Sequence, residues 1–176
     1  MTHDLTKLKE FWRVEFLRST TFSWLKLFNK IVSTSNERKF YFWWRLANEM
    51  FMTNKKRYKR TAAKVNKKQI KRNNIEIMLG AKIGKGLKIV HFSGLVVTDQ
   101  VKIGENFTCH QFVTIGVNKK CCNILIGDNV TIGCNSVIIG GNVKIGNNVY
   151  VGAMSFINKD IPDNYTVFTE KKLILR

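Results

Sequence analysis

The chain has 176 residues and a formal net charge of +18, a length that fits one compact domain plus an appendage. No uncharged apolar run approaches the ~18 residues that a transmembrane helix requires, and the sequence shows no pattern of a secretory signal peptide. The charge is unevenly distributed, because residues 1–74 contain 19 Lys and Arg against 5 acids, whereas residues 75–176 contain 11 against 7.

The N-terminal region, residues 1–74, is predicted to be helical. Its apolar residues recur at steps of three and four, with Lys and Arg between them. Asp4 is a plausible helix start, a second apolar block spans residues 40–52, and residues 55–72 carry ten basic residues and no acid. The recurring positions are Leu5, Leu8, Phe11, Trp12, Phe16, Trp24, Leu27, Phe28 and Ile31.

The surface of this region has two interpretations. It contains 13 of the 20 aromatic residues of the chain. The aromatic face either lies on a membrane surface, with cations near anionic headgroups, or packs on the rest of the chain or on a partner subunit. Nothing in the sequence resembles a nucleic-acid-binding motif.

A six-residue repeat follows, from about Ile77 to Ile157. Its unit begins with an aliphatic residue and usually a glycine. The frame slips by two residues after Leu95, is interrupted by residues 117–123, and slips by one at Gly140-Gly141. Aliphatic residues in step are Ile77, Ile83 and Ile89, then Ile103 and Ile115, then Ile126, Ile132 and Ile138, and finally Ile145, Val151 and Ile157.

This period predicts the fold. Six residues fit neither a helix nor a simple half-buried strand, but they fit a short strand followed by a tight corner. Three such strands close a triangular coil of about 18 residues, and successive coils stack at the usual strand spacing. The repeat therefore predicts a mainly β protein, a parallel β-helix of four to five coils behind a short α-helical region.

Cysteines and histidines are few. Cys121 and Cys122 are adjacent, while Cys109 and Cys134 occupy repeat positions and lack the spacing of a metal site, so packing is their expected role. His91 differs from a structural histidine because Glu76 precedes it by 15 residues, just under one coil, so that stacking brings the two near each other. His110 is interpreted as structural.

The repeat resembles a known family in three segments: Ile75-Glu76-Ile77 with residues 81–97, residues 111–116, and residues 126–133. These are similar to the serine acetyltransferase branch of the hexapeptide acyltransferases, over roughly residues 75–160. The resemblance implies a left-handed parallel β-helix, a homotrimer, and acetyl-CoA bound in the groove between adjacent subunits, with no metal.

The resemblance also implies site residues. His91 matches the general base that takes a proton from the acceptor hydroxyl, a role that typically contributes 10²–10⁴-fold. Glu76 matches the carboxylate that orients this histidine, in place of the usual aspartate. Gly116, Cys134 and Ala153 match the positions along which pantetheine runs, and backbone N–H groups would stabilise the oxyanion.

Departures from the family shape the expected acceptor. Val90 stands where serine acetyltransferases have an aspartate, and Cys122-Asn123-Ile124 replaces an Arg-His-Pro stretch. These residues lack the charges that hold an amino acid. We therefore expect an O-acetyltransferase of bacterial surface-polysaccharide biosynthesis, acting on a saccharide or lipid-linked saccharide. The short aromatic N-terminus, with Trp44-Arg45-Leu46-Ala47, is similar to that group. The alternative is a serine O-acetyltransferase of cysteine biosynthesis.

The expected division is an N-terminal region of residues 1–74, an acyltransferase domain of residues 75–162 and a tail of residues 163–176. The expected location is cytoplasmic, with peripheral contact at the inner face of the cytoplasmic membrane. Two other classes fit less well. A metal-dependent hydratase needs three histidine ligands, whereas the repeat holds only His91 and His110, and a structural scaffold would not need the pairing of Glu76 with His91.

Overall fold

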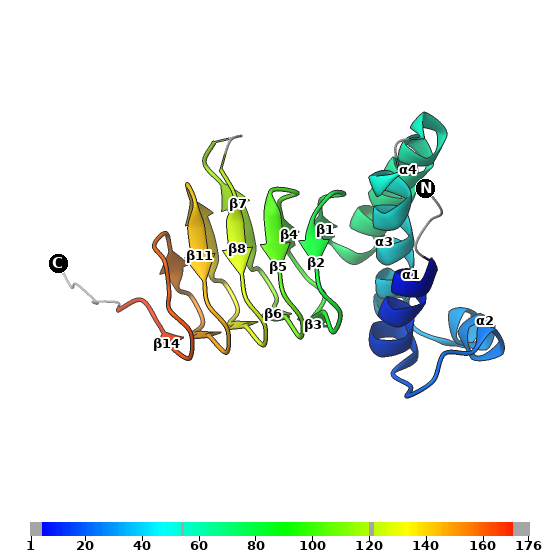
Figure 1. The fold of residues 1–176 in the computed structure, drawn as a ribbon, viewed down its shortest axis with the longest axis horizontal. Helices are drawn as coiled ribbons and strands as arrows, with labels where there is room; N and C mark the ends of the chain where they lie inside the picture. The colour runs from blue at the N-terminus through cyan, green and yellow to red at the C-terminus, as the bar shows by residue number, and fades with distance from the viewer. Residues whose placement is uncertain (1–4, 54, 120–121, 171–176) are drawn as a thin grey trace.

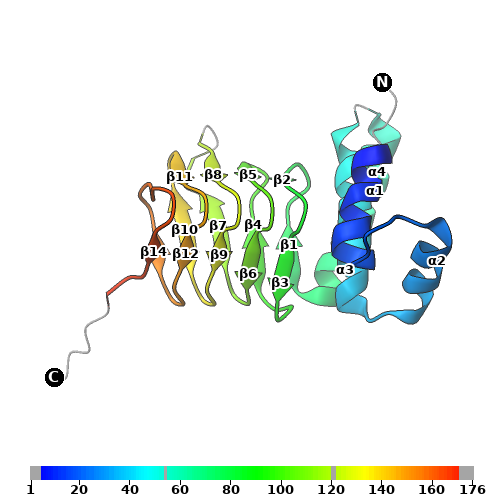
Figure 2. The same ribbon diagram turned by 60° about the horizontal axis from the view of Figure 1, so that its bottom comes forward.

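The computed structural model describes residues 5–53, 55–119 and 122–170. Helices gather at one end of an elongated molecule and a stack of short strands forms the rest (Figures 1 and 2). The predicted start at Asp4 lies outside the described residues. The helical elements are α1 (Leu5–Phe11), the π-helix η1 (Trp12–Leu17), α2 (Trp24–Ser33), α3 (Asn36–Met52) and α4 (Lys56–Asn73).

The strands form three sheets, and every strand pairing is parallel. This arrangement confirms the predicted β-helix with an α-helical N-terminal region. The first sheet contains β1 (Ile75–Ile77), β4 (Leu95–Val97), β7 (Thr114–Val117), β10 (Val137–Gly140) and β13 (Phe156–Ile157). The second contains β2 (Lys82–Ile83), β5 (Val101–Ile103), β8 (Ile124–Ile126) and β11 (Val143–Ile145). The third contains β3 (Lys88–Val90), β6 (Thr108–His110), β9 (Thr131–Ile132), β12 (Tyr150–Val151) and β14 (Thr166–Val167).

The register shows where the coils depart from 18 residues. Val97 pairs with Ile115, a coil of 18, whereas Ile75 pairs with Leu95, a coil of 20. The two additional residues lie before Leu95, in the corner between β3 and β4, and not after it as expected from the sequence. The loop at 117–123 lengthens a later coil, in which Ile115 pairs with Ile138, to 23.

One corner of the coil carries a ladder of asparagines. Asn106 donates through its side-chain amide to Asn129 at 3.0 Å, Asn129 to Asn148 at 3.0 Å, and Asn148 to Asn164 at 2.8 Å. All four have a positive φ, between 54° and 65°. Asparagine tolerates this left-handed conformation, so the ladder forms the corner and links successive coils.

Helix α3 covers the first coil, whose strand edge would otherwise expose unpaired backbone groups. The indole N–H of Trp44 donates to the carbonyl of Ile77 at 3.1 Å, and the amide of Asn48 donates to that of Ala81 at 3.0 Å. The Tyr41 hydroxyl accepts from the Ile89 N–H at 2.8 Å. The aromatic face of α3 therefore packs on the repeat domain. For α3, this is the second of the two interpretations of the aromatic face of residues 1–74, packing on the rest of the chain.

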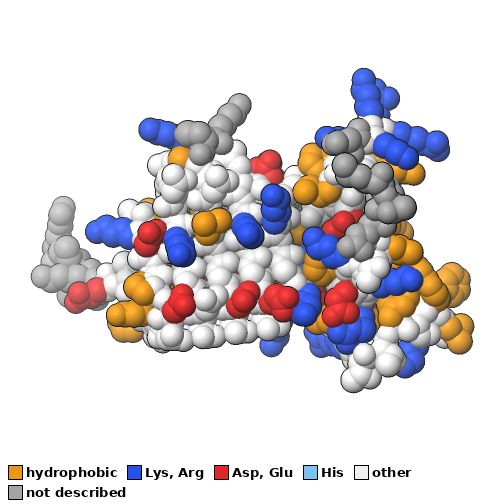
Figure 3. Space-filling view, in the orientation of Figure 1, with side chains coloured by type: hydrophobic (Ala, Val, Ile, Leu, Met, Phe, Trp, Pro, Cys, Tyr) orange, Lys and Arg blue, Asp and Glu red, His pale blue; other side chains and the backbone are white. Residues whose placement is uncertain are grey.

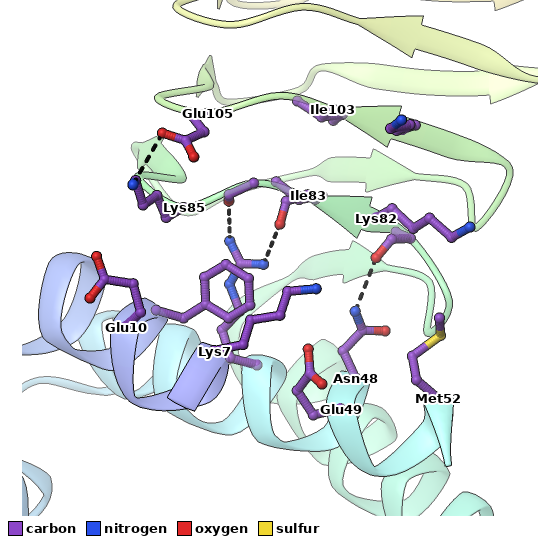
Figure 4. Close-up of a pocket in the computed structure, with 15 residues that line it drawn as sticks. Lys7, Glu10, Asn48, Glu49, Met52, Lys82, Ile83, Lys85, Ile103 and Glu105 are labelled. Carbon is purple, nitrogen blue, oxygen red and sulfur yellow. Dashed lines mark hydrogen bonds and ion pairs between the residues drawn. The ribbon is translucent and has the colours of Figure 1, made fainter. Parts of the chain in front are cut away.

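A buried ion pair completes the contact between the helices and the first coil. The guanidinium of Arg45 in α3 donates to both carboxylate oxygens of Glu15 in η1, at 2.6 and 2.9 Å. The same guanidinium donates to the carbonyls of Ile83 and Gly84, both at 2.7 Å (Figure 4). The Leu87 N–H donates to Glu15 at 3.0 Å.

Candidate active site

His91 occupies the corner between β3 and β4 that is two residues longer than its counterpart in the next coil. Its φ is 59°, a conformation that non-glycine residues rarely adopt and that often marks functional sites. The side chain is exposed. The corner therefore presents an imidazole outside the regular coil, where a substrate can reach it.

The turn at His91 depends on Gly94. Gly94 has a φ of 63°, and a Cβ there would collide with the ring of Phe112 in the next coil. The Phe112 N–H also donates to the carbonyl of Ser93 at 2.9 Å. The longer corner thus rests closely against the corner that follows it.

Strand register places two of the other predicted site residues, Cys134 and Ala153, in one column beside the His91 corner. Val90 pairs with His110, Cys109 with Ile132, and Ile132 with Val151. At the corner, the Phe112 N–H donates to the carbonyl of Ser93, the Asn135 N–H to that of Gln111 and the Met154 N–H to that of Cys134. The equivalent residues in successive coils are therefore Ser93, Gln111, Cys134 and Ala153, and His91 lies in the additional residues just before Ser93. Cys134 is half-buried and Ala153 is exposed, so both leave room beside the corner.

Glu76 lies on the outward face of β1, opposite Val96 of β4, and is exposed. The structure records no hydrogen bond or ion pair between Glu76 and His91 among the residues it describes. The backbone segments next to the two residues meet, since the Asn74 carbonyl accepts from the Gly94 N–H at 2.8 Å just before β1. The direct contact between the carboxylate and the imidazole stays a prediction.

Gly116 lies on β7, away from the corner column. It pairs with Ile139 of β10, and a Cβ built at this position would meet nothing within 4 Å. The other glycines that carry a repeat corner, such as Gly104 and Gly127, sit against backbone atoms of the next coil. Gly116 therefore leaves an open strip on the outer face of the first sheet.

Gln111 received no role from the sequence, although it belongs to the segment that carries the family resemblance. In the column it lies between Ser93 and Cys134. Its side-chain oxygen is buried and has no hydrogen-bond partner among the described residues. Burying a polar atom without a hydrogen-bond partner lowers the stability of the fold. The only sequence signal for Gln111 was its position in the repeat, which becomes informative once the strand register is known.

The thiols differ in environment. Cys109 is fully buried in the core, and burial raises the pKa of its thiol to about 12. This agrees with its expected packing role, because a thiol that stays protonated is a poor nucleophile. Within the described ranges, no group of three His, Cys, Asp or Glu side chains could hold a metal ion.

A cavity of about 520 Å³ lies elsewhere, between α1 and α3 on one side and β2 and β5 on the other (Figure 4). Lysines and glutamates line it together, among them Lys82, Glu49 and Glu105. No residue of the His91 corner lines it. The candidate site is therefore an exposed corner of the chain, separate from this cavity.

Comparison with known proteins agrees with the repeat architecture. Residues 123–159 match the profile of the family described as bacterial transferase hexapeptide (six repeats). This part of the repeat domain is therefore similar to that family. The hexapeptide domain has curated relatives named serine acetyltransferase, at 45% identity in Staphylococcus epidermidis and 40% in Staphylococcus aureus strain Mu50. Each match extends over 96 residues, 53% of this chain and 45% of the relative, so the chain matches less than half the length of these relatives.

Solved structures show the same fold. A serine acetyltransferase from Neisseria gonorrhoeae in complex with serine superposes with a TM-score of 0.73, at 23% identity, over 94% of this chain and 66% of its own. The soybean serine acetyltransferase apoenzyme superposes with a TM-score of 0.72, at 25% identity, over 92% and 64% of the two chains. The similarity includes the helical end as well as the hexapeptide domain.

These findings contradict the expectation of a polysaccharide O-acetyltransferase with a saccharide acceptor, because the curated relatives named above, at 45% and 40% identity, are serine acetyltransferases. The expectation relied on the uncharged residues Val90, Cys122 and Asn123. Cys122 is buried, with 8% of its surface exposed, and therefore does not line a surface that an acceptor can reach. Its lack of charge says nothing about the acceptor.

Proposed function

We propose that the chain is an acetyl-CoA-dependent serine O-acetyltransferase, the step that commits serine to cysteine biosynthesis. The observation that carries the proposal is the 45% identity to a serine acetyltransferase over 96 residues. The exposed imidazole of His91 in an extended corner supports it, because acyl transfer to a hydroxyl needs a positioned base. Acetyl-CoA is used inside cells, so the proposed reaction is cytoplasmic.

In this proposal His91 is the general base. Its neutral imidazole takes the proton of the serine hydroxyl as that oxygen attacks the thioester carbonyl. The C–O bond forms, the C–S bond of the tetrahedral intermediate breaks, and the proton passes to the departing thiolate of CoA. Backbone N–H groups of the corner stabilise the oxyanion, and no covalent enzyme intermediate is needed.

Glu76 is proposed as a positioning residue for His91. A carboxylate that accepts from one ring nitrogen fixes the tautomer in which the other nitrogen is free to act as base. Glu76→Gln is expected to lower kcat about tenfold and to shift the pH profile of kcat, as expected for a residue that acts through the histidine. Glu105→Gln, at an exposed glutamate of another corner, is the matched control and is expected to leave both unchanged.

Acetyl-CoA is proposed to lie along Gly116, Cys134 and Ala153 in a groove between adjacent subunits of a homotrimer. The small or half-buried side chains of the column and the open strip at Gly116 support this placement. The outward face of the first sheet also carries exposed apolar residues, Val96 and Phe156, which favour contact with another subunit.

The direct test is to incubate the full chain with acetyl-CoA and L-serine and to follow release of free CoA thiol. We expect thiol release that depends on L-serine and that yields O-acetylserine by mass spectrometry. L-Alanine, which lacks the hydroxyl, is the matched control and should give only background hydrolysis. Equal thiol release with both amino acids would contradict the proposal.

A further inference from the structure

Helix α2 exposes an apolar face to solvent. Ser23 begins the helix, since its side-chain oxygen accepts from the Lys26 N–H at 3.4 Å. Leu27 alone is buried against the other helices, with 3% of its surface exposed. Three large apolar side chains face outward, with exposed fractions of 72% for Leu25, 67% for Phe28 and 70% for Val32. Trp24 is 54% exposed and packs in part against the rings of Trp12 and Phe22.

These four residues form one continuous stripe. Positions 24, 28 and 32 follow the four-residue spacing of a helix face and position 25 adjoins it, whereas Lys26 and Lys30 lie round the helix on its polar side. We call Trp24, Leu25, Phe28 and Val32 the α2 stripe. An apolar stripe opposite a lysine-bearing side is the pattern of a helix that lies in a membrane interface.

The position of α2 leaves the stripe accessible. Both ribbon views place α2 at the outer end of the helical region, on the side of α3 that faces away from the β-helix (Figures 1 and 2). Figure 3 shows hydrophobic side chains at this end of the molecule, next to Lys and Arg side chains. The stripe therefore projects beyond the part of the chain that forms the candidate site.

The positive charge of the helical region indicates what kind of partner binds the α2 stripe. The segment from Arg18 to Lys39 contains five basic residues and one acid, Glu37. Residues 1–74 contain 19 basic residues against 5 acids, a net of +14. Two copies of this region would repel each other, whereas an anionic lipid surface attracts it at about 1 kcal/mol per basic residue near the surface. A nucleic acid would match the charge but would not cover the apolar side chains.

We propose that the α2 stripe docks the protein on the surface of a bilayer that contains anionic phospholipids. The apolar side chains enter the boundary between headgroups and acyl chains, and Lys26 and Lys30 remain at the level of the headgroups. The chain lies on the membrane and does not cross it, since no helix of the described residues is long and apolar enough to span a bilayer. This surface is separate from the proposed catalytic corner.

The test is flotation of the full chain with vesicles of phosphatidylcholine alone and of phosphatidylcholine with 30% phosphatidylglycerol. We expect binding to the anionic vesicles, a blue shift of tryptophan fluorescence on binding, and weaker binding at high salt. The triple variant Leu25→Ser, Phe28→Ser, Val32→Ser is expected to lose at least about tenfold in partitioning, because it removes most of the inserted area.

Two controls keep the outcome unambiguous. Asn29→Ala changes the polar side of the same helix and is expected to bind as the wild type does. Circular dichroism and thermal unfolding of the triple variant are expected to match those of the wild type, because all three side chains are exposed. Wild-type-like flotation of the triple variant overturns the proposal, as does absence of wild-type binding. A smaller oligomer of the triple variant with unchanged flotation also overturns it and identifies a second copy as the occupant.

Discussion

Arg45 and Glu15 form a bidentate ion pair with side-chain exposures of only 2% and 1%, and the pair joins helices to backbone groups of the first coil. The guanidinium also lies 3.9 Å from the centre of the Phe11 ring. Each of the three guanidinium nitrogens donates at least one hydrogen bond. An ion pair buried this deeply fixes how the helices pack on the β-helix, because either charge alone would be buried without water or a counterion.

Glu15→Gln is therefore expected to lower the free energy of unfolding by about 3–5 kcal/mol, since it leaves the Arg45 charge buried without its counterion. Urea unfolding at one fixed protein concentration measures the loss. Glu10→Gln is the matched control, because Glu10 pairs with Arg13 at 2.7 Å on the exposed surface, and surface pairs contribute little. Equal effects of the two substitutions would show that the buried pair does not carry the contact.

Alkaline pH is expected to destabilise the fold. Burial raises the pKa of Cys109 from 9.0 to about 12 and that of Tyr41 from 10.0 to about 12. The unfolded chain therefore loses these protons first, and stability that is complete below pH 9 is lost as the pH rises toward 12. Unfolding followed between pH 8 and pH 11 should show this decline, and a shallower one for Cys109→Ala. An identical slope in the two proteins would rule out Cys109 as a source.

The asparagine ladder predicts how substitutions at a corner with positive φ change the stability of the fold. Asn129 has a φ of 56° and is bonded through its side chain to both Asn106 and Asn148. Asn129→Ala is expected to cost about 1–2 kcal/mol, because alanine is strained in this conformation and breaks the ladder. Asn129→Gly removes the same hydrogen bonds without the strain and is expected to cost less. The reverse order in thermal unfolding would mean that backbone conformation does not decide the cost.

A substitution at Gly116 is expected to weaken acetyl-CoA binding without destabilising the fold. Its Cβ position faces open space, and valine suits a strand, so Gly116→Val should leave the melting temperature nearly unchanged. If acetyl-CoA lies along this strip, the added methyl groups are expected to raise the KM for acetyl-CoA about tenfold, with a smaller effect on kcat. Steady-state kinetics measures both. An unchanged KM would remove Gly116 from the binding groove.

Much of the fold follows from the sequence, because a strict six-residue period leaves few arrangements for the buried isoleucines. The helix at residues 40–52 was also foreseeable from its apolar spacing, and α3 contains it. The position of the two-residue slip could not be predicted from the sequence. Leu95 and Val97 are both aliphatic and both buried, so either residue can continue the six-residue repeat. Only the pairing of Ile75 with Leu95 decides between them.

The candidate site was less accessible to sequence reasoning. The 15-residue spacing predicted that Glu76 lies near the His91 corner, but not how the side chains point. Gln111 became visible only through register, and the docking of Arg45 on Ile83 and Gly84 links residues 38 and 39 positions apart. Such contacts depend on how the helices fold back on the first coil, and no local pattern encodes that.

The most direct test of the proposed mechanism compares His91→Ala with His110→Ala in the transfer of acetyl from acetyl-CoA to L-serine. His110 lies on the neighbouring strand, in register with Val90, and is the matched control. We predict that kcat falls about 10²–10⁴-fold for His91→Ala, with the elution volume in gel filtration unchanged, and that His110→Ala stays near the wild type. Full activity of a folded His91→Ala variant would contradict the assignment of His91 as the general base.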